Sequence, residues 1–445
     1  MKSFIIIGGG ASGVITAAQL LRTSPESVVR IFERSGRIGA GIAYSTENPG
    51  HLLNVRASNM SAFPDEPDHF LNWLRSNQPV VSGPEWEPHS FAPRMYYRSY
   101  LVNLLTLYLN VDKPRLIIDN SEVSDVMLED GKPLAVTASG DRFPADAVIL
   151  ATGNEPAIAT SGKHVTEYWS SNGYFDMPSD IPVAIFGTGL SMIDSVLSLL
   201  DSGHKGVIHA ISRRGLMPAG HAAVKPFPVA ADDIPSASGL SGLVRHVREM
   251  TDQAAANGSN WRAVIDGLRP FTQSLWGGLP LSQRSSFLRH LRPWWDVHRH
   301  RMAPDVAERI AAARASGQLT VTAGNLVSLK DEGNGIVVRY RKRHSNVPED
   351  IRVAAIIDCR GGNPRFSTTR NAVLIGLMEQ GLARPDALDL GFDVTGDFRL
   401  VNTQGAATEA LFAIGPTTRG TFWEVTAVPD IRAQVERLVS VLLAG

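Results

Sequence analysis

The sequence predicts an α/β protein in which one strand–turn–helix unit is nested inside another, with a helical insertion in the inner unit. Three observations carry this prediction: glycine-rich turns that follow apolar strands at 4–13 and at 181–192, and a repeated segment that ends each unit. Alternation of apolar strands with helical stretches is typical of parallel sheets covered by helices.

The first turn fits the pattern G-x-G-x-x-G between an apolar strand and a helix. Gly8 allows the tight turn, Gly10 lets the backbone approach a pyrophosphate, and Gly13 lets the helix pack closely on the strand. Ala11 and Ser12 lie at the start of the helix, where free N–H groups and the positive end of the helix dipole can bind phosphates. This arrangement indicates a nucleotide site.

An acidic residue completes the pattern. Glu33 ends the second apolar strand, 20 residues after Gly13, where a carboxylate accepts hydrogen bonds from a ribose. Arg34 follows it and is assigned to the same site. Glycines also serve ordinary turns, but strand, helix and acid together favour dinucleotide binding.

The second turn follows the strand at 181–186, and its candidate cofactor residues are Gly187, Gly189 and Ser191. Met192 replaces the third glycine, so close packing of helix on strand is less firmly indicated. The next strand ends in Arg213 and Arg214 without an acid. An arginine at this point suits a 2′-phosphate, which favours NADP over NAD. The alternative is an arginine pair on the surface at a strand end.

The segment at 148–156 matches that at 356–364 in register, and each copy follows short alternating strands. Thr152 and Gly153 end the first copy and are expected beside the first cofactor. Such a repeat indicates internal duplication. The predicted fold is therefore two nested Rossmann-like dinucleotide-binding domains with a helical insertion.

Several stretches carry a resemblance to a known family. Residues 146–154 resemble the D-x-x-x-L-A-T-G signature of flavin N-hydroxylases and related class B monooxygenases. Over nearly its full length the chain resembles a bacterial FAD/NAD(P)-binding oxidoreductase family, through the stretches 39–44, 51–55, 261–266, 294–301 and 420–432. The resemblance implies a glutathione-reductase-like arrangement, with FAD on the outer unit and NADPH on the inner one.

The same resemblance implies further flavin contacts. Gly39, Gly41 and Asn54 lie in a loop that related proteins place against the isoalloxazine ring, although a plain surface loop is the alternative. Arg94 is assigned to the phosphates or adenine of FAD, or to a structural role. Gly415 and Pro416 are expected near the ribityl chain, where relatives commonly carry Gly-Asp; the proline puts a side-chain hydrogen bond there in doubt.

The motifs also divide the chain. Residues 1–160 and 355–445 are expected to form a discontinuous FAD domain, and residues 175–350 an NADP domain. Residues 215–315 do not fit a Rossmann crossover, and their helical patterns predict a cap inserted in the NADP domain. Such a cap can close over the reacting centre.

Within the cap, residues 284–301 hold five arginines and three histidines against one acid. One interpretation is a substrate subsite for an anion, with Arg299 and Arg301 as forks and Trp295 as a wall; Trp423 is assigned to the same subsite. The other is a helix face that pairs with carboxylates elsewhere and packs its tryptophans into the core. Spacing of the histidines by two residues puts them on different helix faces, so no metal is expected.

Composition excludes several classes. The 445 residues include 43 basic and 44 acidic side chains, so no overall field favours nucleic acid or an anionic membrane. The sequence holds neither a signal peptide pattern nor an apolar run long enough to span a bilayer, and a cytoplasmic location is expected. Cys359 is the single cysteine, which excludes dithiol chemistry and thiolate metal sites.

These observations predict an FAD-dependent oxidoreductase that is reduced by NADPH. Monooxygenation of a small molecule by oxygen through a C4a-hydroperoxyflavin, with N-hydroxylation as one form, is the leading hypothesis. The alternatives are an NADPH-dependent flavin reductase or dehydrogenase without productive oxygen activation, and a flavin-holding, redox-responsive binding protein. The sequence supplies no Ser/His/Asp set and no carboxylate pair with assignable roles, so no catalytic residue is assigned. Substrate identity and oligomeric state stay open.

Overall fold

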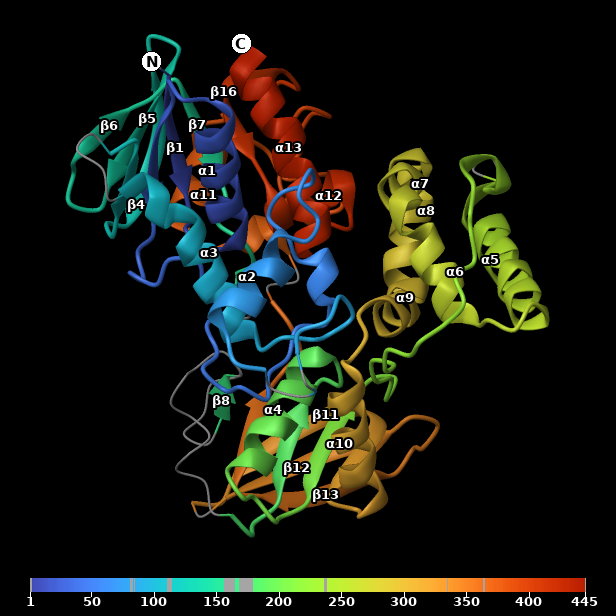
Figure 1. The fold of residues 1–445 in the computed structure, drawn as a ribbon. Coiled ribbons are helices and arrows are strands. Elements are labelled where there is room, and N and C mark those ends of the chain that lie inside the picture. The colour runs from blue at the N-terminus through green and yellow to red at the C-terminus, as the bar shows by residue number, and fades with distance from the viewer. Residues whose placement is uncertain are drawn as a thin grey trace.

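The computed structural model describes residues 2–80, 83, 85–109, 114–155, 165–167, 179–235, 238–333, 335–362 and 365–444. Two sheet-containing lobes lie one above the other in Figure 1, and a separate group of helices stands beside them. The α/β fold with nested parallel sheets that the sequence predicts is confirmed.

The first lobe contains a six-stranded sheet. Its central strands pair in parallel and only the edge pair β15–β16 is antiparallel. In spatial order the strands are β15 (Arg399–Val401), β16 (Ala407–Ala413), β7 (Ala147–Leu150), β1 (Ser3–Ile7), β2 (Val28–Phe32) and β3 (Leu116–Asp119). A small antiparallel sheet accompanies it: β4 (Val123–Glu129), β5 (Lys132–Thr137) and β6 (Arg142–Pro144).

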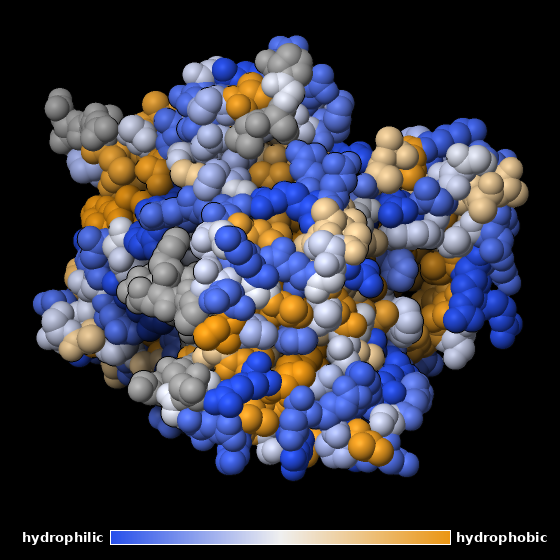
Figure 2. All heavy atoms as spheres, turned by 90° about the horizontal axis from the view of Figure 1, so that it is seen from below, coloured by the Kyte–Doolittle hydropathy of each residue, from blue (hydrophilic) through white to orange (hydrophobic). Residues whose placement is uncertain are grey.

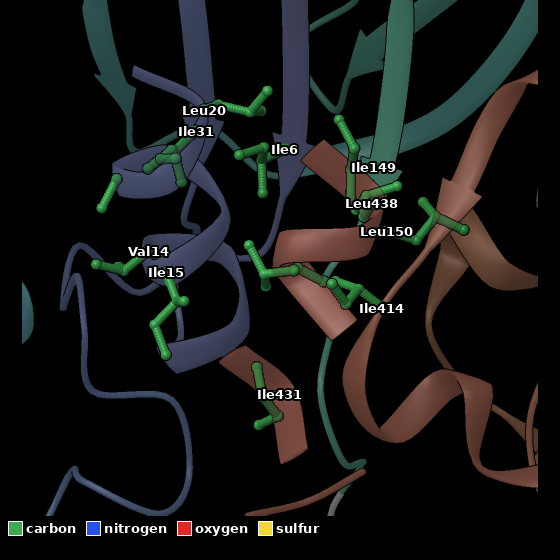
Figure 3. Packing of buried hydrophobic residues seen from close by; sticks show 14 of the residues in the cluster. Ile6, Val14, Ile15, Leu20, Ile31, Ile149, Leu150, Ile414, Ile431 and Leu438 are labelled. Atoms are coloured by element: carbon green, nitrogen blue, oxygen red, sulfur yellow. The ribbon is translucent and has the colours of Figure 1, made fainter. Parts of the chain in front are cut away.

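Apolar side chains from strands and helices fill this lobe. The helices are α1 (Ala11–Thr23), α2 (His69–Asn77), α3 (Arg94–Leu109), α11 (Ala372–Glu379), α12 (Arg419–Phe422) and α13 (Val428–Ala444). Figure 3 shows Ile6 of β1 and Ile149 of β7 close to Leu438 of α13, with Ile15 of α1 nearby. A strand buried on both faces needs a continuous apolar run, which β1 and β7 supply.

The second lobe contains a seven-stranded sheet: β13 (Pro348–Val353), β12 (Ile336–Lys342), β11 (Leu319–Asp331), β10 (Ile208–Ser212), β9 (Val183–Phe186), β14 (Ala355–Asp358) and β8 (Val165–Glu167). The strands from β11 to β8 are parallel, and β12 and β13 extend the sheet as an antiparallel hairpin. Helices α4 (Leu190–Asp201) and α10 (Pro304–Ala315) belong to this lobe.

Two expected boundaries move in the structure. The strand at 355–358 pairs with β9 of the second sheet, as β7 pairs with β1 of the first, so the outer lobe resumes after Cys359 and not at 355. Helix α10 buries Val306 and Ile310 in the second core, so the cap ends before it and not at 315. Both boundaries differ because the apolar residues of these two segments are buried in the second lobe. The expected boundaries at 160 and 175 lie outside the described residues.

The cap consists of helices that carry a small core of their own, around Met250 and Val264. They are α5 (Gly239–Ala256), α6 (Trp261–Leu268), α7 (Thr272–Gly278), α8 (Leu281–Ser286) and α9 (Arg292–Arg299), with a π-helical turn at Phe287–Leu291. Trp276 Nε1 donates to the carbonyl oxygen of Gly420 over 2.8 Å, which ties the cap to the C-terminal segment.

Polar contacts join the two lobes. Nη1 and Nη2 of Arg94 (α3) donate to the Asp194 carboxylate (α4), over 2.7 and 3.2 Å. His51 Nε2 lies 2.9 Å from Ser198 Oγ, and Asn48 Nδ2 lies 3.1 Å from Asp201 Oδ2. Seen from below, hydrophilic side chains alternate with smaller apolar groups over the surface (Figure 2). Among the described helices, none combines the length and apolarity needed to cross a bilayer.

Candidate functional site

A cleft of about 340 Å³ opens where the first sheet meets α1. The sequence-predicted residues that line it are Gly8, Gly10, Ala11, Ser12, Glu33, Arg34, Gly41, Thr152, Gly153 and Pro416. They come from the carboxyl ends of parallel strands and the loops that follow, which is where open α/β sheets bind ligands.

Close backbone packing explains the glycines of the two turns. Gly8 has φ +108°, and a β-carbon there would lie 2.4 Å from the carbonyl oxygen of Ala151. Gly187 repeats this geometry, with φ +101° and a distance of 2.4 Å to the carbonyl oxygen of Cys359. Ala151 and Cys359 occupy the same position of the repeated segment, so the two lobes share one construction. At Gly13 a β-carbon would lie 1.9 Å from the oxygen of Gly8, so α1 can approach β1 only with glycine there.

The cleft offers polar groups that fit a dinucleotide. Gly10 is the N-cap of α1, no side chain caps the helix, and no acid lies in its first turn. Its N–H groups are therefore available to phosphates. Thr152 lines the cleft with a buried hydroxyl that has no hydrogen-bond partner among the described residues. Glu33 Oε2 accepts from the Gly9 N–H over 2.9 Å, which holds this carboxylate against the turn.

Three other predicted flavin residues do not line the cleft. The Gly39 N–H donates to the Gly9 carbonyl over 2.7 Å, which holds the loop that contains Gly39 against the first glycine-rich turn. A β-carbon on Gly415 would lie 2.6 Å from Ser12 Oγ, so this residue packs against the start of α1. The Asn54 carbonyl lies 3.1 Å from His221 Nε2.

The assignment of Arg94 to the flavin differs from the structure. Its guanidinium group faces Asp194 of the second lobe, with side-chain exposures of 14% and 6%, and it lines neither cleft. A buried arginine needs a counter-ion, and the carboxylate supplies it. Of the two roles open in the sequence, the structural one is the one observed.

A second cleft of about 810 Å³ lies between the two lobes and the cap. Arg213 and Arg214, which follow β10, both line it, and Arg213 is exposed. Gly187, Gly189 and Ser191 do not line it: the first two shape the turn and the N-cap of α4, and Ser191 accepts through its carbonyl from Ser195. The two clefts share wall residues Gly153, Asn154 and Pro416, so they meet.

The predicted substrate forks pair with carboxylates. Arg299 lies 3.8 Å from Glu424 Oε2 and 3.5 Å from Asp430 Oδ2, with 7% of its side chain exposed. Arg301 is paired with Asp266. Trp295 Nε1 donates to Glu424 Oε1 over 2.7 Å. This is the second interpretation of the basic run, a face that pairs with carboxylates.

Trp423 is also buried. Its ring stacks on Trp276 at 4.8 Å between centroids, and Phe287 meets it edge-on at 5.2 Å. Besides Arg213 and Arg214, five arginines that sequence reasoning did not assign reach the second cleft: Arg289, Arg292, Arg343, Arg360 and Arg419. Arg289 and Arg292 lie in the basic run, but helix phase decides which members face the cleft. Arg343, Arg360 and Arg419 follow strands or turns, and no pattern in the sequence singles them out.

The single cysteine stays inert in this arrangement. Cys359 is buried, and burial raises the pKa of its thiol to about 12. Its sulfur lies 3.3 Å from Ser195 Oγ. Because the thiolate is the reactive form, Cys359 supplies no nucleophile near neutral pH. Among the described residues, no three His, Cys, Asp or Glu side chains are grouped as a metal site.

Acidification is expected to destabilise the protein through His221. Its Nδ1 is buried with no partner among the residues described, so a second ring proton would meet no acceptor. Burial, and then the positive charge of Arg301, lower the pKa of His221 to about 4. The unfolded chain takes up this proton near pH 6.5, the ordinary value for histidine.

Stability is therefore full above pH 6.5 and falls as the pH drops towards 4, by up to about 1.4 kcal/mol per pH unit from this histidine. Urea denaturation at pH 7.0 and 5.5 measures the slope. His221→Gln should flatten it, whereas His344→Gln, on an exposed turn, should leave it unchanged. An unaltered slope in His221→Gln would contradict this account.

Comparison with known proteins indicates the same kind of ligand as the clefts, a nucleotide cofactor. Residues 5–155 match the family model described as FAD-NAD(P)-binding. A Mycobacterium tuberculosis protein, Rv3403c, is 20% identical and covers 99% of this chain and 95% of its own length. YdhS of Escherichia coli is 24% identical over 45% of this chain and 39% of its own length.

Solved structures show the same fold over the full chain. The ornithine N-hydroxylase of Kutzneria sp. 744 has a TM-score of 0.67 at 16% identity, with 100% of this chain and 99% of that chain covered. The L-lysine 6-monooxygenase of Pseudomonas syringae has a TM-score of 0.68 at 15% identity, with the same coverage.

The chain has two nested lobes in the fold of the solved N-hydroxylases, and its first lobe matches an FAD-NAD(P)-binding model. The predicted relation to flavoproteins with the N-hydroxylase fold, and the prediction of FAD and a nicotinamide dinucleotide as cofactors, are thereby confirmed.

Proposed function

We propose that the protein is an NADPH-dependent flavin monooxygenase that acts on a small molecule. The observation that carries the proposal is the common wall of the two clefts, formed by Gly153, Asn154 and Pro416. FAD in the first cleft and a nicotinamide in the second would meet at this wall. When bound, FAD accepts hydride from NADPH and passes electrons on to oxygen.

The residues of each lobe have separate tasks in this proposal. The turn at Gly8–Gly13 and the α1 N-terminus hold the FAD pyrophosphate, with Thr152 and Glu33 as polar contacts. Arg213 and Arg214 hold the 2′-phosphate of NADPH. Outer and inner lobes thus act as the FAD and NADP domains.

The cap has the task of excluding water. Its π-helical turn and α9 contribute Leu288, Arg289, Arg292 and Pro293 to the second cleft, beside the common wall. Exclusion of water protects a reactive oxygen species from decay, which a monooxygenase requires and a simple reductase does not. The ornithine N-hydroxylase and the L-lysine 6-monooxygenase match this fold with TM-scores of 0.67 and 0.68, above the 0.59 of the bacillithiol disulfide reductase of Staphylococcus aureus, which supports oxygen chemistry over disulfide reduction. The single, buried cysteine favours it too.

A rapid-mixing experiment tests the proposal. The holoprotein is reduced anaerobically by NADPH and then mixed with oxygen, and the absorbance of oxidised flavin is followed together with hydrogen peroxide. A delay before the oxidised spectrum returns is expected. Immediate return with one peroxide per flavin would assign a reductase, and failure of NADPH to bleach the flavin would leave a binding protein. Either of these outcomes overturns the monooxygenase proposal.

A further inference from the structure

The second cleft is unusually rich in arginine. Seven arginines line it against three carboxylates, Glu155, Asp296 and Asp389. Two of these carboxylates have arginine partners: Glu155 lies 3.4 Å from Arg370 outside the lining, and Asp296 lies 3.4 Å from Arg292. A strong excess of positive charge therefore faces the cleft.

The lining arginines form two groups. One belongs to the second lobe, after strands β10, β12 and β14: Arg213, Arg214, Arg343 and Arg360. The other belongs to the cap and the C-terminal segment: Arg289, Arg292 and Arg419. The nicotinamide nucleotide accounts for the first group under the proposed function. The second group, the cap-side arginines, needs another explanation.

Arg419 is the most informative of the cap-side arginines. Its Nε is buried and has no hydrogen-bond partner, and it forms no ion pair among the described residues. Burial, followed by the nearby charge of Arg292, lowers its pKa to about 10. Arg299, in the same region, has Glu424 and Asp430 as partners. Arg419 as a whole is half-buried, and the carboxylates of Asp296 and Glu424 act on its charge. Neither carboxylate pairs with it among the described residues, so its buried Nε is open to an anion.

The indole ring of Trp423, next to Arg419, also carries a buried donor without a partner among the described residues. The Arg419 Cζ lies 4.6 Å from the ring centroid of Trp423, and the Arg292 Cζ lies 5.9 Å from it. Trp423 Nε1 is itself buried with no acceptor in the described part of the chain. Trp423 also has φ +61°, a backbone conformation that costs energy in a non-glycine residue and occurs often at ligand sites. Two positive groups and an unsatisfied donor thus meet at one ring.

We propose that Arg419 and Arg292 bind an anionic group of the substrate, so that the substrate is an acidic small molecule that carries a carboxylate or a phosphate. That the anion belongs to a substrate rests on the proposed function, whereas the anion site itself does not. Pro416 and Thr417 line the cleft beside Arg419, and Pro416 also lines the first cleft. An anion held here would place the rest of its molecule at the common wall of the two clefts.

The same chemistry has a second source, the pyrophosphate of NADPH, and the test separates the two. Succinate and inorganic phosphate are titrated calorimetrically into the FAD-loaded protein, with and without saturating NADP⁺. Succinate or phosphate is expected to bind in both conditions. Arg419→Gln should weaken this binding at least about tenfold, or about 1.4 kcal/mol, and leave the NADP⁺ affinity within about twofold.

Two further variants separate loss of the anion site from a general effect of removing an arginine. Arg245→Gln, exposed on α5 of the cap, should bind like the wild type. Arg292→Gln should weaken the anion as well, which keeps the test decisive if Arg419→Gln does not fold. Absence of anion binding in the wild type, wild-type anion affinity in both Arg419→Gln and Arg292→Gln, or loss of NADP⁺ affinity in Arg419→Gln would each overturn the proposal. Because calorimetry needs no turnover, a failed oxygen reaction would refute the monooxygenase and leave the anion site standing.

Discussion

Replacement of Gly10 by alanine is expected to give a folded protein that binds FAD on the order of a hundredfold more weakly, equivalent to about 2.7 kcal/mol. A β-carbon at Gly10 would lie 3.4 Å from the Gly41 α-carbon, an ordinary van der Waals contact, so the fold accepts it. It would project from the N-cap of α1 into the space that a pyrophosphate needs. Flavin absorbance per protein and the FAD dissociation constant measure the effect, with circular dichroism as the test of folding.

Two glycines serve as comparisons for this variant. Gly277→Ala in α7, where a β-carbon meets nothing within 4 Å, should keep wild-type flavin content. Gly13→Ala should fail to fold, because its β-carbon would collide with the Gly8 carbonyl. Full flavin occupancy in Gly10→Ala would refute the placement of the pyrophosphate at this turn.

The second large effect concerns the choice of nicotinamide nucleotide. Arg213→Ala is expected to raise the NADPH concentration for half-maximal flavin reduction by about 10- to 100-fold, the range for a lost arginine–phosphate contact. NADH lacks the 2′-phosphate, so its reaction should change little. Anaerobic stopped-flow reduction of the flavin by each nucleotide measures the difference.

Arg341→Ala provides the control, because Arg341 is exposed on β12 of the same lobe and does not line the cleft. Its NADPH reaction should match that of the wild type. Equal losses for NADPH and NADH in Arg213→Ala would remove the case for a phosphate contact and return Arg213 to the surface pair that the sequence left open.

Local patterns predicted the frame of this molecule well. Both turns, the strands that precede them and the repeated segment depend on short-range spacing, and the structure places Gly8 and Gly187 in one common geometry. The expected boundary at 355 differs from the structure because the second copy of the repeat forms the counterpart of β7 inside the second sheet. Periodicity marks a strand, but hydrogen bonding to a distant neighbour decides its sheet.

The side chains of the candidate site were harder to predict. Composition located the basic run, yet Arg299 and Arg301 point to carboxylates while Arg289 and Arg292 reach the cleft. Arg94 shows the same difficulty, since its partner Asp194 lies 100 positions away in sequence. Long-range pairing of charges depends on the tertiary fold, and no spacing rule within one helix can supply it.

The ion pair between Arg94 and Asp194 also bears on how a ligand enters the second cleft. Separation of the lobes would break this ion pair, whose side chains are 14% and 6% exposed, together with the His51 and Asn48 contacts. We therefore expect the two lobes to keep their relative position when ligands bind. Under the proposed function, the nicotinamide nucleotide would enter and leave the second cleft without separation of the two lobes.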